Sequence, residues 1–139
     1  MPRTTLTDTR IIAADYEVIP IYLQLNDVTT TAGTHYIFTP AKPGQIMGLD
    51  FVTSEAGTGA GATVTFTPAV GGTAVVGGTC VVTLAGTSDI GEETTGAAIT
   101  AGQKFTASQT VSIQSSSTTV FTAGSGYLKL KVEYGTQPN

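Results

Sequence analysis

The sequence has little of what most enzymes and secreted domains depend on. It contains one Cys, one His and no Trp, and charged residues make up only 12% of it. A single Cys excludes an internal disulfide framework. The formal net charge of −4 argues against nucleic-acid binding, because phosphate backbones attract basic surfaces. No apolar run approaches the ~20 residues of a membrane-spanning helix. The first ten residues also lack the apolar stretch of a signal peptide, so we expect synthesis in a cytoplasm.

In place of charge the chain carries hydroxyl groups and glycine. It has 27 Thr and 17 Gly in 139 residues, and 40% of the residues are hydrophobic. The β-branched Thr side chain suits a half-buried strand, and Gly suits tight turns. One domain of short strands joined by Gly-rich turns is therefore expected.

Alternation of apolar and polar residues marks the strands. Residues 16–26 alternate, with Pro20 in the middle. Because proline cannot donate to a ladder, this strand is expected either to lie at a sheet edge or to be broken at Pro20. Residues 45–54 are apolar on both faces, which predicts a central strand with Met47 on the same face as Leu49 and Phe51. Residues 70–79 predict a hairpin with Gly-Gly turns, and 115–119 (SSSTT) predict a loop. The clearest alternation is that of the final strand, 127–134.

These patterns predict an all-β fold: an antiparallel β-sandwich, jelly-roll-like, with about eight strands, and no helix. It would occupy residues 16–139, preceded by an N-terminal extended arm, residues 1–15. The predicted core consists of the inward-facing residues Leu23, Phe38, Leu49, Phe51, Val64, Phe66, Leu84, Leu128, Leu130 and Val132.

No motif indicates catalysis, a metal or another cofactor. One histidine, His35, makes neither a zinc site nor a triad without converging partners, and strand alternation turns it away from Tyr36 and Phe38. Cys80 is typical of a small buried hydrophobic residue. The segment 57–61 (GTGAG) is followed by a strand rather than by the Lys and helix of a phosphate-binding loop. The prediction is that the protein is not an enzyme.

The loop 85–96 holds three acidic residues, Asp89, Glu92 and Glu93. Clustered oxygen ligands can bind Ca²⁺, but the alternating spacing of a calcium loop is absent. A solvated acidic loop is the simpler interpretation.

The arm is the best candidate for contact with a partner. It holds both arginines, Arg3 and Arg10, and the apolar pair Ile11 and Ile12. Arginine forms bidentate contacts with carboxylates, and an extended segment can add a strand to a partner's sheet edge. A frayed terminus is the alternative interpretation.

Three segments together resemble a known class of proteins. They are 34–52 (THYIFTPAKPGQIMGLDFV), 98–108 (AITAGQKFTAS) and 126–134 (GYLKLKVEY). Their order resembles small all-β virion proteins of tailed bacteriophages, especially capsid decoration, or cement, proteins. The resemblance implies a jelly-roll or related sandwich and a homotrimer on the outer capsid surface, bound to the major capsid protein and stabilising the head.

A second hypothesis comes from a different functional class. It is a carbohydrate- or host-surface-binding module of a phage fibre or bacterial adhesin, in which exposed tyrosines would take the place of the missing Trp. A small hydrolase on a β scaffold is disfavoured by the single His.

Overall fold

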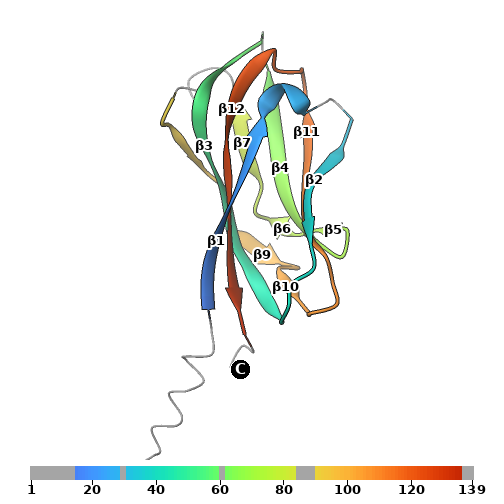
Figure 1. Cartoon of the computed structure of the whole chain (residues 1–139). Coiled ribbons are helices and arrows are strands. Elements are labelled where there is room, and N and C mark those ends of the chain that lie inside the picture. Colours follow the sequence, from blue (N-terminus) through green and yellow to red (C-terminus); the bar gives the residue numbers. More distant parts are fainter. Residues whose placement is uncertain (1–14, 29–30, 60–61, 84–89, 136–139) are drawn as a thin grey trace, which may run out of the picture.

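The computed structural model describes residues 15–28, 31–59, 62–83 and 90–135 (Figure 1). Within these ranges the chain forms twelve strands and one short 3-10 helix, η2 (Leu25–Asp27). The strands are β1 (Asp15–Gln24), β2 (Gly33–Phe38), β3 (Gly44–Thr58), β4 (Thr63–Val70), β5 (Thr73–Ala74), β6 (Val76–Gly77), β7 (Cys80–Thr83), β8 (Glu93–Thr95), β9 (Ile99–Ala101), β10 (Lys104–Phe105), β11 (Val111–Ser117) and β12 (Ala123–Tyr134).

Eight of these strands form an antiparallel sandwich in jelly-roll order. In the first sheet β1 pairs with β12, β12 with β3, and β3 with β8; in the second, β2 pairs with β11, β11 with β4, and β4 with β7. The short strands β10 and β5 extend the sheets at β3 and β4, and β6 pairs with β9 separately. The predicted fold class is confirmed, down to the jelly-roll order of the strands.

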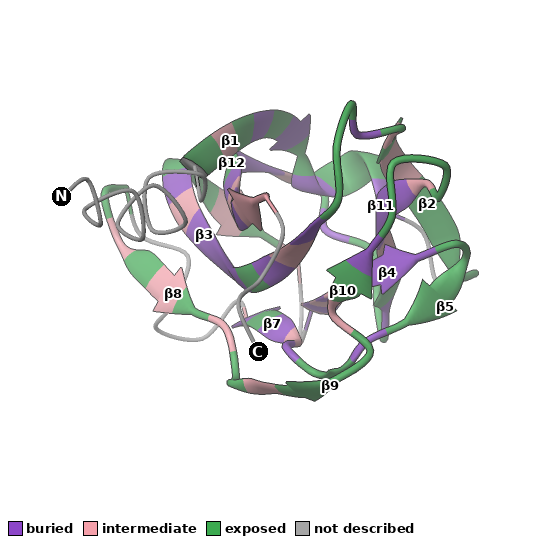
Figure 2. Cartoon of the chain, turned by 90° about the horizontal axis from the view of Figure 1, so that it is seen from below, coloured by how far each residue is buried: buried purple, intermediate pink, exposed green. Residues whose placement is uncertain are grey.

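The first strand lies at an edge, as Pro20 predicts. In the described part of the chain β1 pairs with β12 alone, in an unbroken register from Asp15 opposite Tyr134 to Gln24 opposite Ser125. From Val18 to Gln24 exposed residues alternate with more buried ones, so that buried and exposed bands follow one another on β1 in Figure 2. One face of β1 therefore belongs to the core and the other to the surface.

The central position of β3 is confirmed, but the face predicted for Met47 is wrong. The ladder between β3 and β12 shifts there: Lys131 lies opposite Gly48 and Val132 opposite Ile46. An extra residue in one strand reverses the alternation on one side of the bulge. Ile46 is consequently buried with the core, whereas Met47 is 40% exposed.

A second bulge corrects the orientation predicted for His35. The ladder of β2 with β11 shifts between Ile113 and Gln114, which leaves His35 as the extra residue on β2. Its ring consequently faces the interior of the sandwich, with its centroid 6.4 Å from that of Phe66. Its Nε2 is hydrogen-bonded to the Oγ of Ser115.

The loop predicted at 115–119 begins later than expected. Ser115, Ser116 and Ser117 continue β11 and pair with β4. Ser115 and Ser117 are buried, because pairing with a central strand outweighs the polarity of the serine side chains.

The hairpin predicted at 70–79 is correct at its first turn only. Val70 lies opposite Thr73, and Gly71 and Gly72 both have positive φ, as a two-residue hairpin turn of this kind requires. The second turn is predicted at Gly77 and Gly78. There β6 (Val76–Gly77) pairs with β9 and does not continue the hairpin.

The core largely matches the prediction. Eight of the ten predicted residues are buried, Phe38 is partly buried against the core, and Leu84 lies outside the described residues. Phe51 of the first sheet stacks on Phe66 of the second, with ring centroids 5.9 Å apart. The two sheets are thus joined through an aromatic contact at their centre.

A buried carboxylate attaches β8 and the residues after it to β3. Asp50 is 7% exposed; its Oδ1 accepts a hydrogen bond from the Gly96 N–H at 3.0 Å, and its Oδ2 lies 3.0 Å from the Lys131 Nζ. Burial acts to raise the pKa of Asp50, but these two partners outweigh it and hold the pKa below its usual value. The carboxylate therefore stays ionised and fixes residues 93–96 on β3.

Candidate protein-interaction surface

The arm residues chosen from the sequence, Arg3, Arg10, Ile11 and Ile12, lie outside the described residues. The arm as a partner contact therefore stays a prediction, and so does its boundary at residue 15.

The candidate catalytic and metal-binding groups do not converge in the part of the chain that the structure describes. No group of three or more His, Cys, Asp or Glu there could hold a metal ion. The Cys80 thiol is buried and donates to the Thr94 carbonyl at 3.4 Å. Burial, with the nearby charge of Asp50, raises its pKa to about 12, so it is protonated at neutral pH and is a poor nucleophile.

The acidic loop is only partly described. Asp89 lies outside the described residues, whereas Glu93 belongs to β8 and its Oε2 lies 2.6 Å from the Lys129 Nζ. The Glu92 carbonyl accepts a hydrogen bond from the Thr53 N–H. Glu93 is thus committed to an ion pair that links β8 to β12 across β3, the strand between them. Among the described elements, no helix is long and apolar enough to cross a membrane.

A row of exposed apolar residues covers the outer side of β1. Tyr16, Val18 and Tyr22 are 69%, 53% and 53% exposed, and Pro20 lies between them on the same side of the strand. Tyr127 of β12 lies opposite Tyr22 and is 43% exposed. We call these five residues the β1 face. Contiguous apolar surface of this kind marks interaction sites on soluble proteins.

Two of its members form an aromatic pair. The rings of Tyr22 and Tyr127 have centroids 5.3 Å apart and are inclined at 61°, an edge-to-face contact. Each ring fixes the orientation of the other while both remain accessible. Tyrosines held in this way are favoured at interfaces, because they offer contact area at a small entropic cost.

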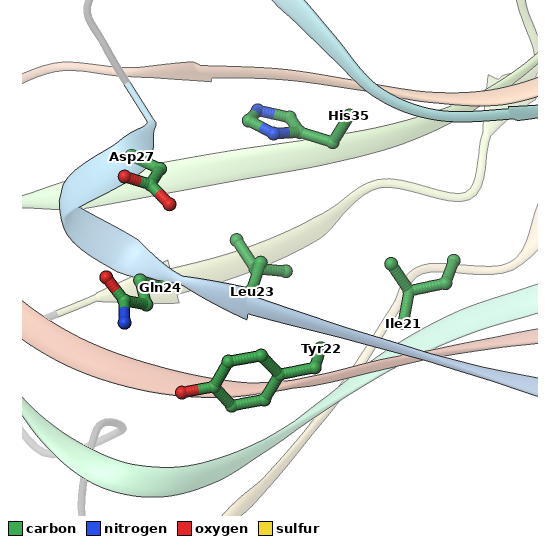
Figure 3. A pocket seen from close by; sticks show the side chains of 6 residues that line it. All are labelled: Ile21, Tyr22, Leu23, Gln24, Asp27 and His35. Carbon is green, nitrogen blue, oxygen red and sulfur yellow. The ribbon is translucent and has the colours of Figure 1, made fainter.

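Beside the β1 face the sandwich has a lateral opening. Its lining residues come from the end of β1, from η2 and from β2, and they are Ile21, Tyr22, Leu23, Gln24, Asp27 and His35 (Figure 3). The volume is about 430 Å³, within the range of ligand-sized pockets. In Figure 3 Ile21 and Leu23 point to the same side of β1 as His35, whereas Tyr22 points to the other side.

Besides Gln24 and Tyr22, the lining residues with polar side chains are Asp27 and His35. Burial lowers the pKa of His35, and the negative charge of Asp27 opposes that shift only in part. The imidazole is therefore neutral at neutral pH. The opening thus combines an apolar floor with one exposed carboxylate and no resident positive charge.

Sequence reasoning missed both surfaces. The outward residues of β1 alternate regularly, and Tyr16, Val18 and Tyr22 are apolar where solvent-facing residues are normally polar. That signal could have revealed the β1 face. The lateral opening could not be predicted in the same way, because it depends on the bulge that turns His35 inward.

The chain is a jelly-roll sandwich with an apolar edge. No family model matches it, and no curated protein matches its sequence. Among solved structures, a protein of the disulfide-linked pili of Bacillus endospore appendages is 18% identical, with 90% of each chain covered and a TM-score of 0.49. A chain of the cyanophage Pam1 capsid is 18% identical, covering 90% of this chain and 87% of that one, with a TM-score of 0.48. A chain of the capsid of Helicobacter pylori bacteriophage KHP30 is 10% identical, covering 87% of each, with a TM-score of 0.48.

Proposed function

We propose that the protein is a non-enzymatic structural component of a bacteriophage virion, a capsid decoration or cement protein. It would bind the major capsid protein on the outer surface of the head and stabilise the shell. The observation that carries the proposal is the β1 face, a row of exposed apolar residues along the edge of a rigid sandwich. The resemblance of segments 34–52, 98–108 and 126–134 to decoration proteins supports the virion assignment.

The β1 face suits a protein partner. A strand surface with exposed tyrosines matches the composition of protein interfaces, which are rich in Tyr and depleted in Lys and Glu at their centres. The nearest cations, Lys129 and Lys131, are engaged within the chain by Glu93 and Asp50. The face therefore offers apolar contact without free charge at its centre.

The arm, residues 1–15, is the second part of the proposed contact. Arg3, Arg10, Ile11 and Ile12 would reach neighbouring subunits of the assembled particle. A homotrimer would present three such arms, and linked contacts raise the effective concentration of each. Avidity of this kind would offset the entropy lost when the arms become ordered, about 1–2 kcal/mol per residue.

Co-sedimentation with heads that lack the protein tests the proposal. We expect the full chain to pellet with such heads, and Tyr22→Ser with Tyr127→Ser to weaken binding by more than tenfold, since a central tyrosine contributes about 2 kcal/mol or more. Ile37→Ser is the matched control, because Ile37 is 62% exposed but lies on β2 of the other sheet. Deletion of residues 2–12 should leave the sandwich folded and reduce binding further.

Failure of the intact chain to sediment with any head would refute the capsid role. Equal binding by the tyrosine double variant and the wild type would remove the β1 face from it.

The exposed pair Tyr22 and Tyr127 also supports a second candidate, carbohydrate binding. Aromatic side chains stack on sugar rings, and jelly rolls occur in lectins as well as in capsids. A glycan array separates the two functions: saturable glycan binding that is lost in Tyr22→Ser, without binding to heads, would favour the carbohydrate-binding module.

A further inference from the structure

The lateral opening is an incompletely covered part of the core. Ile21 and Leu23 of β1 keep 9% and 7% of their surface exposed, whereas Leu128 and Leu130 of the adjacent β12 keep none. The two strands beside the opening are sheet edges: in the described part of the chain, β1 pairs only with β12, and β2 only with β11. An added strand would therefore find an apolar floor and backbone groups able to pair with it.

The opening also sets the chemistry of its occupant. Asp27 lies at its rim and is exposed, and His35 beside it is neutral, so the site has an acidic edge without a compensating cation in its lining. A strand that fits this opening needs an apolar residue for the floor. It also needs a basic residue on the same side of the strand for the acidic rim. In a strand, residues two apart share a side.

The chain itself contains such a segment. Arg10 and Ile12 are two residues apart, and both of the chain's arginines lie in its first ten residues. With Ile12 against Ile21 and Leu23, Arg10 would reach Asp27, forming a charge-assisted contact of the kind that arginine and carboxylate favour.

We propose that the lateral opening receives residues 10–12 of a second copy of this chain, with Ile12 on the apolar floor and Arg10 paired with Asp27. The inference is independent of the virion role. It assigns Arg10 and Ile12 to a contact with a neighbouring copy in place of the capsid. Arg3 and Ile11 keep their proposed contact with the capsid.

The chain between Ile12 and β1 is too short for Ile12 to enter the lateral opening of its own copy. Ile12 precedes Asp15, the first residue of β1, by three residues, which span at most about 11 Å. The lateral opening begins at Ile21, six residues along β1, or about 20 Å from Asp15. Ile12 therefore cannot reach the opening of its own chain, and the segment in the opening would have to come from a neighbouring copy.

Where the arm of each copy enters the opening of the next, rather than two copies exchanging arms, the contact is head-to-tail. Interfaces of this type close into rings when the rotation between copies permits it. The expected homotrimer is one such ring, with three arms in three openings.

Charge reversal tests the proposal by analytical ultracentrifugation of the full chain without heads. The wild type should sediment as an assembly larger than the 14.2 kDa monomer. Arg10→Glu and Asp27→Lys should each lower the association constant by about tenfold or more, and the two together should restore it. Arg3→Glu is the matched control, since it changes the charge of the arm equally but should not affect assembly.

A monomeric wild type, unchanged assembly of Arg10→Glu, or failure of the paired reversal to restore assembly would each overturn the proposal. Because no heads are present, these outcomes are separate from those of the sedimentation assay with capsids.

A cross-linking experiment tests the pairing directly. One preparation carries Ile12→Cys and the other Gln24→Cys, a residue that lines the lateral opening. The native Cys80 is buried and does not compete. After oxidation, the mixture should give more disulfide-linked dimer than either preparation alone, and the same yield in all three samples would contradict the proposed contact.

Discussion

Replacing Asp50 by Ala should destabilise the protein strongly. The substitution removes the acceptor of the Gly96 N–H, and a hydrogen bond to a charged group contributes about 1.5–3 kcal/mol. It also removes the ion pair with Lys131, whose side chain is 39% exposed, so that this pair adds less than about 1 kcal/mol. Together the loss is about 3 kcal/mol.

Thermal unfolding followed by circular dichroism measures this loss. For a chain of this length about 3 kcal/mol corresponds to a decrease of about 10 °C in Tm. Glu93→Ala is the matched control, because it removes a shorter ion pair, 2.6 Å to Lys129, whose side chains are 46% and 35% exposed. Its cost should stay within about 1 kcal/mol.

The pH dependence gives a second readout. The folded-state pKa of Asp50 is lowered from its ordinary value of 3.8, so its stabilisation is fully present above that value. It is lost as pH falls through the lower folded-state pKa. The difference in unfolding free energy between wild type and Asp50→Ala should therefore be constant near neutral pH and shrink in acid. Equal Tm values for Asp50→Ala and Glu93→Ala at pH 7 would show that the buried contacts of Asp50 contribute no more than an exposed ion pair.

Three further results are expected. Gly126→Ala should cost about 3 kcal/mol in urea unfolding, because the added Cβ would lie 2.3 Å from the Phe51 ring and 2.4 Å from a backbone oxygen; unchanged stability would contradict this packing. Gly33→Ala should be nearly neutral, because nothing lies within 4 Å of that Cβ. The Cys80 thiol, with its pKa raised to about 12, should resist iodoacetamide at pH 8 in the folded protein and react in denaturant; rapid labelling of the native protein would contradict its burial.

Regular alternation made much of the fold predictable. Along β1 and β12 one face is buried and the other is solvated, so the sequence pattern and the burial pattern coincide. Pro20 indicated the sheet edge for a separate reason, since it has no N–H to donate to a ladder.

The errors fall where the ladder is irregular. Bulges beside Met47 and His35 reverse the alternation, and a bulge depends on the pairing of two strands rather than on either strand alone. Ser115 and Ser117 are buried for a related reason: their place is set by β4, to which their strand pairs. Because the bulge at His35 shapes the lateral opening, that part of the candidate site could not be predicted from the sequence either.

The proposed role of this sandwich is to bind the outer surface of a phage head. A difference map between cryo-electron microscopy reconstructions of heads with and without the added protein shows whether and how it binds. We expect difference density of jelly-roll size on the outer surface, with the β1 face, from Tyr16 to Tyr22, toward the shell. Saturated heads that show no added density, or density that contacts the shell only through the opposite sheet at Ile37, would contradict it.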